Sequence, residues 1–227
     1  MNLNLLPQRA RDGDQHAVET AAFVLALRAR GIRDTAVLGA MERARRELFA
    51  PRRFADLART DVALPLPCGQ TMTAPSVVAV MVSALAAGCG GRALEIGTGS
   101  GWVTAVLAKL GCRVQTVERY ATLAESAAAR FAVAGVAGAI ALNVGDGLAP
   151  GAIEGRFDRI LVNGAVFSVP AHVTSLLGPG GRLVGALVSD GWPRLVRIDR
   201  LPDGQLAQDL GPALRVARLA AGQAAFL

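Results

Sequence analysis

Hydrophobic and polar residues follow two different periods along this chain, and the period changes near residue 91. Before that point, apolar residues recur every three or four positions, which is the spacing of one helix face. The pattern predicts helices over residues 14–30, 34–46 and about 74–87. Gly31 is placed to end the first helix and Asp34 to cap the start of the second. Residues 51–75 are loop-like and rich in proline.

Beyond residue 91, short apolar segments alternate with helical ones. Strands are predicted over residues 92–96, 113–118, 139–144, 157–163 and 182–188, and helices over 101–110, 121–134 and 170–177. Such alternation implies right-handed crossovers and a mostly parallel sheet. A last pair of strands flanks LPDGQL, whose Asp203-Gly204 is a hairpin signal, so the final strand is expected to join antiparallel.

The predicted fold is α/β: a Rossmann-like, doubly wound, mostly parallel sheet with an antiparallel C-terminal strand, preceded by an N-terminal helical segment. At 227 residues the chain suits one large domain and is too short for two of typical size. We therefore expect a single domain over residues 1–227. Within it, residues 1–75 form a helical or lid segment and residues 76–227 form the Rossmann-like core.

Composition and charge exclude several classes of protein. The longest mainly apolar run, residues 76–88, is shorter than the roughly 18–20 residues that span a bilayer. The N-terminus lacks the charged and apolar regions of a signal peptide, so a cytoplasmic location without membrane association is expected. The cysteines Cys68, Cys89 and Cys112, with two histidines, fit neither a disulfide framework nor a zinc site, and no metal is expected.

The net charge of +6 is concentrated near the start, where residues 1–60 hold eleven arginines against seven acids. This bias could attract nucleic acid or acidic peptides. It is more typical of solvated helix faces.

The strongest local signal is ALEIGTGSGW at residues 93–102, where a strand leads through three glycines into a helix. Glycines let the backbone turn tightly and approach a ligand closely. Trp102 stands where a dinucleotide-binding motif needs glycine, and the ending of a phosphate-binding P-loop is missing. With Glu95 two residues ahead of Gly97, the pattern is that of Rossmann-like methyltransferases that use S-adenosylmethionine (AdoMet).

Two further acids lie at the ends of the next predicted strands. Glu118 can accept hydrogen bonds from both hydroxyls of a ribose. Asp146, within Gly-Asp-Gly at residues 145–147, can accept from an adenine amino group. The residues expected to bind the cofactor AdoMet are Glu95, Gly97, Thr98, Gly99, Ser100, Gly101, Glu118, Arg119, Asp146 and Gly147.

Seven blocks make the chain resemble the protein-L-isoaspartate O-methyltransferases over nearly its whole length. They are VLGAMERARRELFAP (37–51), DVALPLPCGQTMTAP (61–75), ALEIGTGSGW (93–102), VERYATLAESA (117–127), GDG (145–147), FDRILVNGAV (157–166) and GPGGRLV (178–184). The second block is the specific one, because most AdoMet methyltransferases lack it. The resemblance implies an enzyme that methylates the free carboxylate of L-isoaspartyl residues in damaged proteins or peptides and so starts their return to aspartate through a succinimide. A monomer is expected.

The resemblance also implies roles on the substrate side. Thr73 matches the family's second hydroxyl residue, usually serine, which lies beside the acceptor carboxylate and the transferred methyl group. Thr71 and the backbone of Asn163, Gly164 and Ala165 are then expected to place the acceptor. An alternative is that Thr73 only caps the helix starting near residue 74. A carboxylate is already ionised at neutral pH, with a pKa of about 3.9, so no catalytic histidine is expected.

The chain departs from the family pattern on the substrate side. Arg59 stands near the place of an aromatic residue, residues 163–166 read Asn-Gly-Ala-Val in place of Thr-Ala-Ala-Ala, and no Phe-Val-Pro-Leu segment is found near the C-terminus. Methylation of another acid or a modified peptide, or AdoMet binding without catalysis, are the alternatives. A nucleic-acid methyltransferase is disfavoured because residues 163–166 lack the prolines that such enzymes carry after the fourth strand. We therefore expect no nucleic acid partner.

Overall fold

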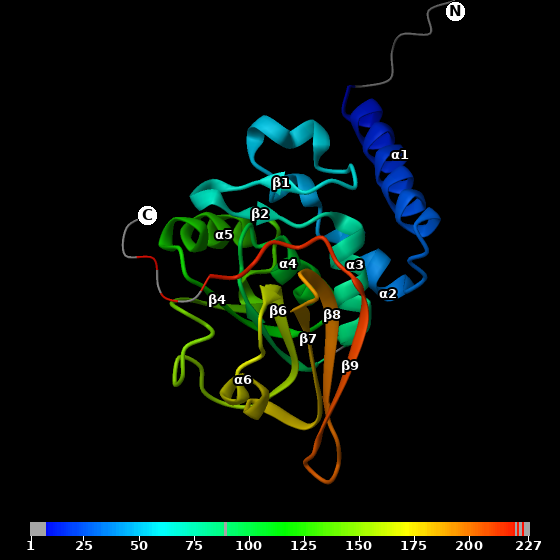
Figure 1. The fold of residues 1–227 in the computed structure, drawn as a ribbon. Coiled ribbons are helices and arrows are strands. Elements are labelled where there is room, and N and C mark those ends of the chain that lie inside the picture. The colour runs from blue at the N-terminus through cyan, green and yellow to red at the C-terminus, as the bar shows by residue number, and fades with distance from the viewer. Residues whose placement is uncertain (1–7, 89, 221, 223, 225–227) are drawn as a thin grey trace, which may run out of the picture.

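The computed structural model describes residues 8–88, 90–220, 222 and 224, with side chains from residue 17 onward. In this part of the chain, seven strands form a sheet in the order β5-β4-β3-β6-β7-β8-β9 (Figure 1). They are β3 Arg92–Ile96, β4 Arg113–Glu118, β5 Ile140–Val144, β6 Phe157–Val166, β7 Leu177–Ser189, β8 Trp192–Arg200 and β9 Leu206–Ala213. Strands β3 to β7 are parallel, whereas β8 is antiparallel to both β7 and β9. The predicted α/β fold and its antiparallel C-terminal pair are confirmed.

Helices cover the sheet and extend from its upper edge in Figure 1. They are α1 Gln8–Ala29, α2 Thr35–Arg43, α3 Pro75–Leu85, α4 Trp102–Lys109, α5 Ala121–Val133 and α6 Ala171–Ser175. Short 3₁₀ turns are η1 Arg46–Leu48, η2 Arg52–Leu57, η3 Pro67–Gly69 and η4 Ala137–Ala139. Among the described helices, none is long and apolar enough to cross a membrane.

The core has two layers because successive residues of a strand point to opposite faces of the sheet. Ala93 and Leu161 belong to the cluster that packs under α2, α3, α4 and α5. Their neighbours Leu94 and Ile160 belong to the cluster on the other face, beside α6. A sheet buried on both faces explains why its strands read as nearly continuous apolar runs.

Several predicted boundaries hold and others shift. Strands β3 and β4 have the predicted bounds, and Asp34 caps α2 by accepting hydrogen bonds from the backbone of Ala36 and Val37, both at 3.0 Å. Helix α2 ends before η1, where Arg45 takes a positive φ of 36°. Strand β6 runs three residues beyond the predicted 163. Helix α6 ends early because Leu177 already pairs with Phe157 of β6.

The segment predicted as loop holds a small hairpin. Strands β1 Leu64–Pro65 and β2 Thr71–Met72 pair antiparallel, with η3 between them. In Figure 1 this hairpin and η2 lie above the carboxyl ends of the central strands, and the chain after β9 crosses between them and the sheet. The N-terminal segment thus covers the end of the sheet where parallel α/β folds bind ligands.

Candidate active site

A pocket of about 820 Å³, counting its open mouth, lies at the carboxyl ends of β3, β4, β5 and β6. The chain moves outward from β3 to β5 on one side of the sheet and returns to β6 on the other, and α/β sheets bind ligands at such a switch point. The walls of the pocket come from residues 70–73, 96–100, 102–103, 117–119, 145–148, Asn163 and 216–220.

Three positive φ angles shape the glycine loop. Gly97, Gly99 and Gly101 have φ of 96°, 55° and 86°, values that other residues rarely adopt. The amide of Gly97 donates to the carbonyl of Val117 at 2.9 Å, which joins the loop to the end of β4. A Cβ on Gly101 would lie 2.7 Å from a ring carbon of Phe131, so this glycine is required by packing against α5. Gly97 and Gly99 instead line the pocket.

The two acids predicted at strand ends both line the pocket. The carboxylate of Glu118 is buried and accepts from the amides of Gly99 at 2.8 Å and Tyr120 at 3.0 Å. The carboxylate of Asp146 accepts from the amides of Leu148 at 2.9 Å and Gly222 at 2.6 Å. A carboxylate offers about four acceptor positions, so each acid keeps capacity for a ligand's donors.

Glu95 lies behind the glycine loop, fully buried and outside the pocket lining. Its carboxyl group accepts from the hydroxyl of Thr104, from the hydroxyl of Thr116 at 2.9 Å and from the amide of Asn163 at 3.1 Å. Burial raises the pKa of Glu95 to about 8, because these hydrogen bonds offset the loss of water only in part, and the Glu118 charge raises it further. Glu95 therefore supports the loop from below, and its side chain lies outside the pocket predicted to hold the cofactor.

Asn163 lines the pocket, but its side chain has a different task from the one expected of its backbone. The side-chain amide donates to Glu95 and also to the carbonyl oxygen of Gly97 at 3.0 Å. It therefore ties the end of β6 to the glycine loop. The T-A-A-A pattern could not suggest this contact, because it depends on an amide that threonine lacks.

Thr71 and Thr73 reach the pocket from the other side. Helix α3 is capped at Ala74 without a side-chain hydrogen bond, and its Ser76 amide donates to the carboxylate of Asp61 at 2.7 Å. The alternative in which Thr73 caps this helix is therefore wrong. Within the described chain the Thr73 hydroxyl makes no hydrogen bond, so it is available to a ligand.

The C-terminal segment at residues 216–220 completes the pocket and was missed by sequence reasoning. It runs beside the end of β6: the amide of Ala165 donates to Ala217 at 2.8 Å, and the amide of Leu219 donates to Ala165 at 2.9 Å. A Cβ on Gly164 would lie 2.5 Å from Leu219 Cγ. Gly164 and Ala165 do not line the pocket. They contact residues 217 and 219 and so hold this segment in place. The signal in the sequence that could have indicated this segment is the apolar residue Leu219, which lies beyond the last strand.

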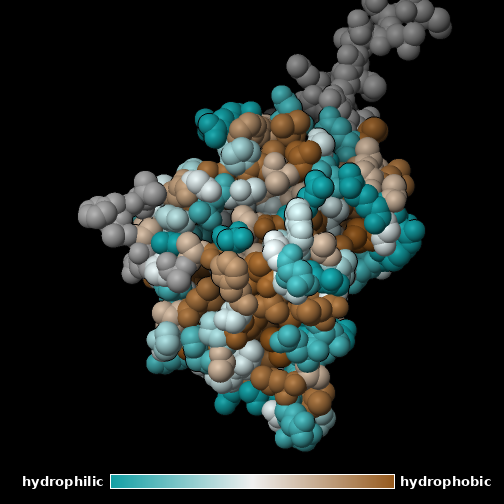
Figure 2. Space-filling model, in the orientation of Figure 1, coloured by the Kyte–Doolittle hydropathy of each residue, from teal (hydrophilic) through white to brown (hydrophobic). Residues whose placement is uncertain are grey.

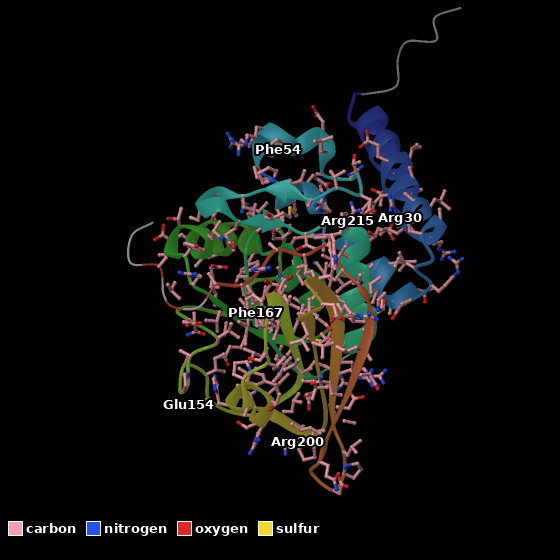
Figure 3. The ribbon with its side chains drawn as sticks, viewed as in Figure 1. Arg30, Phe54, Glu154, Phe167, Arg200 and Arg215 are labelled. Atoms are coloured by element: carbon pink, nitrogen blue, oxygen red, sulfur yellow. The ribbon has the colours of Figure 1, made fainter. Side chains whose placement is uncertain are left out.

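The surface around the C-terminal segment carries an exposed aromatic residue. The side chain of Phe167, just after β6, is 70% exposed, and the guanidinium of Arg218 lies 4.9 Å from its ring centre. Figure 3 labels Phe167 on this face, with Arg215 above it. Figure 2 shows an apolar area in the middle of the same face, bordered by hydrophilic side chains.

Arg59, which stands near the place of an aromatic residue in the family, belongs to an ion-pair network. Arg59 lies 2.6 Å from a carboxylate oxygen of Glu19 and 2.9 Å from one of Glu47. It therefore links α1 to η1, outside the lining of the pocket. Elsewhere, Cys112 is buried, Cys68 is half-buried, and Cys89 lies outside the described residues. In the described chain no three His, Cys, Asp or Glu side chains are grouped to hold a metal.

The fold, the glycine loop and the acids at successive strand ends define a Rossmann-like, AdoMet-dependent methyltransferase. The sequence model of the family protein-L-isoaspartate(D-aspartate) O-methyltransferase (PCMT) matches residues 18–219. A protein-L-isoaspartate O-methyltransferase of Azorhizobium caulinodans is 44% identical over 222 residues, covering 95% of this chain and 99% of the relative. One of Methylorubrum populi is 45% identical over 185 residues, covering 81% of this chain and 86% of the relative. The chain belongs to the protein-L-isoaspartate(D-aspartate) O-methyltransferase family.

Solved structures agree on the fold. A Plasmodium falciparum protein, provisionally assigned as a protein-L-isoaspartate O-methyltransferase and crystallised with S-adenosyl-L-homocysteine, superposes with a TM-score of 0.77 at 20% identity, covering 88% of this chain and 97% of that chain. A second protein-L-isoaspartate O-methyltransferase gives a TM-score of 0.78 at 21% identity, covering 90% and 67%. At these identities the likeness shows the architecture alone.

Proposed function

We propose that this protein transfers a methyl group from AdoMet to the free carboxylate of L-isoaspartyl residues in damaged proteins or peptides. Family membership over residues 18–219 supports the reaction. The single observation that carries the site is the free hydroxyl of Thr73, which shares one pocket with the glycine loop, Glu118 and Asp146. Isoaspartyl-containing proteins are the substrates.

The residues present fit AdoMet. The backbone from Gly97 to Ser100 lines the pocket without a Cβ at either glycine, which lets a ligand approach closely. The open acceptor positions of Glu118 would take the ribose hydroxyls, and those of Asp146 would take the adenine amino group. When bound, AdoMet supplies an electrophilic methyl group on a sulfonium.

The acceptor side needs little acid–base chemistry. An isoaspartyl carboxylate is ionised at neutral pH, so the chain has only to orient it and exclude water. Thr73 would donate a hydrogen bond from its hydroxyl to that carboxylate, Thr71 would line the same wall, and residues 216–220 would cover it. His172 lies outside the pocket lining, with its Nε2 2.9 Å from the carbonyl oxygen of Leu148.

The test is to locate the methyl ester by mass spectrometry in one peptide that contains isoaspartyl, aspartyl and glutamyl residues. We expect the ester on the isoaspartyl residue alone, with a strong loss in Thr73→Ala and retention in Thr73→Ser. An ester on aspartate or glutamate would point to a different carboxyl substrate. Binding of AdoMet without any ester would indicate a module that has lost catalysis.

We further propose that the protein acts as a cytoplasmic monomer and as a single domain, with no nucleic acid or membrane partner. The N-terminal segment and the sheet contribute to the same pocket, which supports one functional unit. Light scattering would give the mass in solution, and a dimer would contradict the monomer.

A further inference from the structure

Arg46 is a buried arginine at the start of η1, with a side chain only 2% exposed. Its Nη1 donates to the carbonyl oxygen of Ala58 at 2.8 Å and to that of Thr60 at 3.4 Å. Its Nη2 donates to the carbonyl oxygens of Val62 at 3.0 Å and Thr73 at 3.2 Å. A planar guanidinium thus joins residues 58–62 to the residue that carries the free hydroxyl of the pocket.

The charge of Arg46 has no close ion-pair partner. Among the described side chains, no carboxylate lies within 4.0 Å of its guanidinium. Burial lowers the pKa of Arg46 to about 10, and the more distant Asp61 opposes this, so the group stays charged at neutral pH. The guanidinium lies 5.2 Å from the ring centre of Trp102, which lines the pocket. A buried charge compensated mainly by carbonyls and an aromatic face is costly to keep.

The segment that Arg46 holds is also fixed through a second side chain. Asp61 accepts from the amide of Ser76 at the start of α3 and forms an ion pair at 2.7 Å with Arg30, the residue that follows α1. Figure 3 labels Arg30 near the end of α1. Residues 58–62 are therefore tied to α1 and α3 by a carboxylate, and to Thr73 through Arg46.

We propose that Arg46 is a positioning residue for the acceptor side of the reaction. It holds the backbone of Thr73 and of residues 58–62 against the Trp102 ring, and this fixes where the Thr73 hydroxyl points. Lysine cannot replace it, because one ammonium group lacks the planar fork that spans four carbonyls from two stretches of chain. The expected effect on kcat/KM rests on the proposed function, whereas the expected effect on the backbone of residues 58–62 does not.

The kinetic experiment compares Arg46→Lys with Arg33→Lys, at a temperature well below the melting point of each variant. Arg33 is a matched control, since it is exposed and also donates to carbonyls, those of Arg28 and Ile32. With an isoaspartyl peptide, Arg46→Lys should lower kcat/KM by about tenfold or more, because a displaced positioning group misaligns the reactants. Its Kd for AdoMet, measured by calorimetry, should stay within about twofold of wild type. Arg33→Lys should change neither value.

Two results would overturn the proposal. An unchanged kcat/KM in folded Arg46→Lys would leave Arg46 with a role in stability alone. An equal loss of AdoMet affinity would mean that the whole pocket is disturbed.

Hydrogen exchange separates this inference from the proposed function, because it needs no substrate. The amides of Thr60, Val62 and Ser76 each donate a hydrogen bond that begins or ends in residues 58–62. In Arg46→Lys they should exchange about tenfold faster or more, while amides of α5 keep the wild-type rate. If wild type methylates no isoaspartyl peptide, the proposed function fails. Unchanged exchange at these three amides refutes the positioning role whatever the substrate proves to be.

Discussion

Glu95→Gln tests whether the carboxyl group beneath the glycine loop is neutral in the folded protein. Glu95 is fully buried, and its pKa is raised to about 8 from an ordinary value near 4.5. In the folded state at neutral pH the group therefore keeps its proton, whereas in the unfolded state it loses it. Glutamine has nearly the same shape and stays neutral at every pH. Its single oxygen can accept from Asn163, and its NH2 group can then donate to the hydroxyl of Thr116.

The sign and size follow from linkage between protonation and folding. Because its pKa is higher in the folded state, Glu95 makes a contribution to the free energy of unfolding that is complete below about pH 4.5. This contribution is lost as the pH rises toward about 8. At about 1.4 kcal/mol for each tenfold change in proton affinity, the full loss is of the order of 5 kcal/mol. The glutamine variant lacks this loss. Its free energy of unfolding should therefore rise relative to wild type by a few kcal/mol between about pH 5 and about pH 8.

Urea denaturation of both proteins at several pH values between about 5 and 8 measures the difference directly. All other titrating groups are shared, so they cancel when the two curves are subtracted. Parallel curves across this range would refute the reasoning and mean that Glu95 is ionised in the folded protein. Glu125→Gln, at an exposed position of α5, is the matched control and should show parallel curves.

Three further substitutions test the pocket. Glu118→Ala should weaken AdoMet binding by about a hundredfold, since it removes acceptors for two hydroxyls. The control Glu125→Ala should bind AdoMet as wild type does. Calorimetry showing equal affinity for wild type and both variants would remove Glu118 from the site. Thr73→Ala should lower kcat by about tenfold or more while changing the AdoMet Kd less than about twofold, and equal turnover would deny the hydroxyl a catalytic role. Gly164→Ala should raise the peptide KM, because its Cβ would meet Leu219 at 2.5 Å and displace the covering segment; an unchanged KM would show that this segment does not contact the peptide.

The sequence predicted best what depends on local pattern. Strands β3 and β4 have the predicted bounds, because each is a short, mostly buried run that begins at an exposed arginine and ends at a turn. The glycine loop was equally readable, since Gly97 and Gly99 need positive φ and the next helix follows directly. Glu118 and Asp146 were found because the strand ends set their positions.

The remaining features depend on contacts between distant parts of the chain. Residues 216–220 line the pocket through pairing with the end of β6, which no local pattern encodes. Arg46 was unremarkable in an arginine-rich segment, and charged residues are rarely fully buried. Asn163 could be placed near the site, yet its hydrogen bonds to Glu95 and Gly97 require the folded geometry.

The central claim is that this pocket methylates the isoaspartyl carboxylate. Its most direct test is the transfer of labelled methyl from AdoMet to one peptide made in two forms, with L-isoaspartyl or L-aspartyl at the same position. We predict labelling of the isoaspartyl form, its strong reduction in Thr73→Ala, and no labelling of the aspartyl form. Equal labelling of both forms, or of neither while AdoMet binds, would contradict the account.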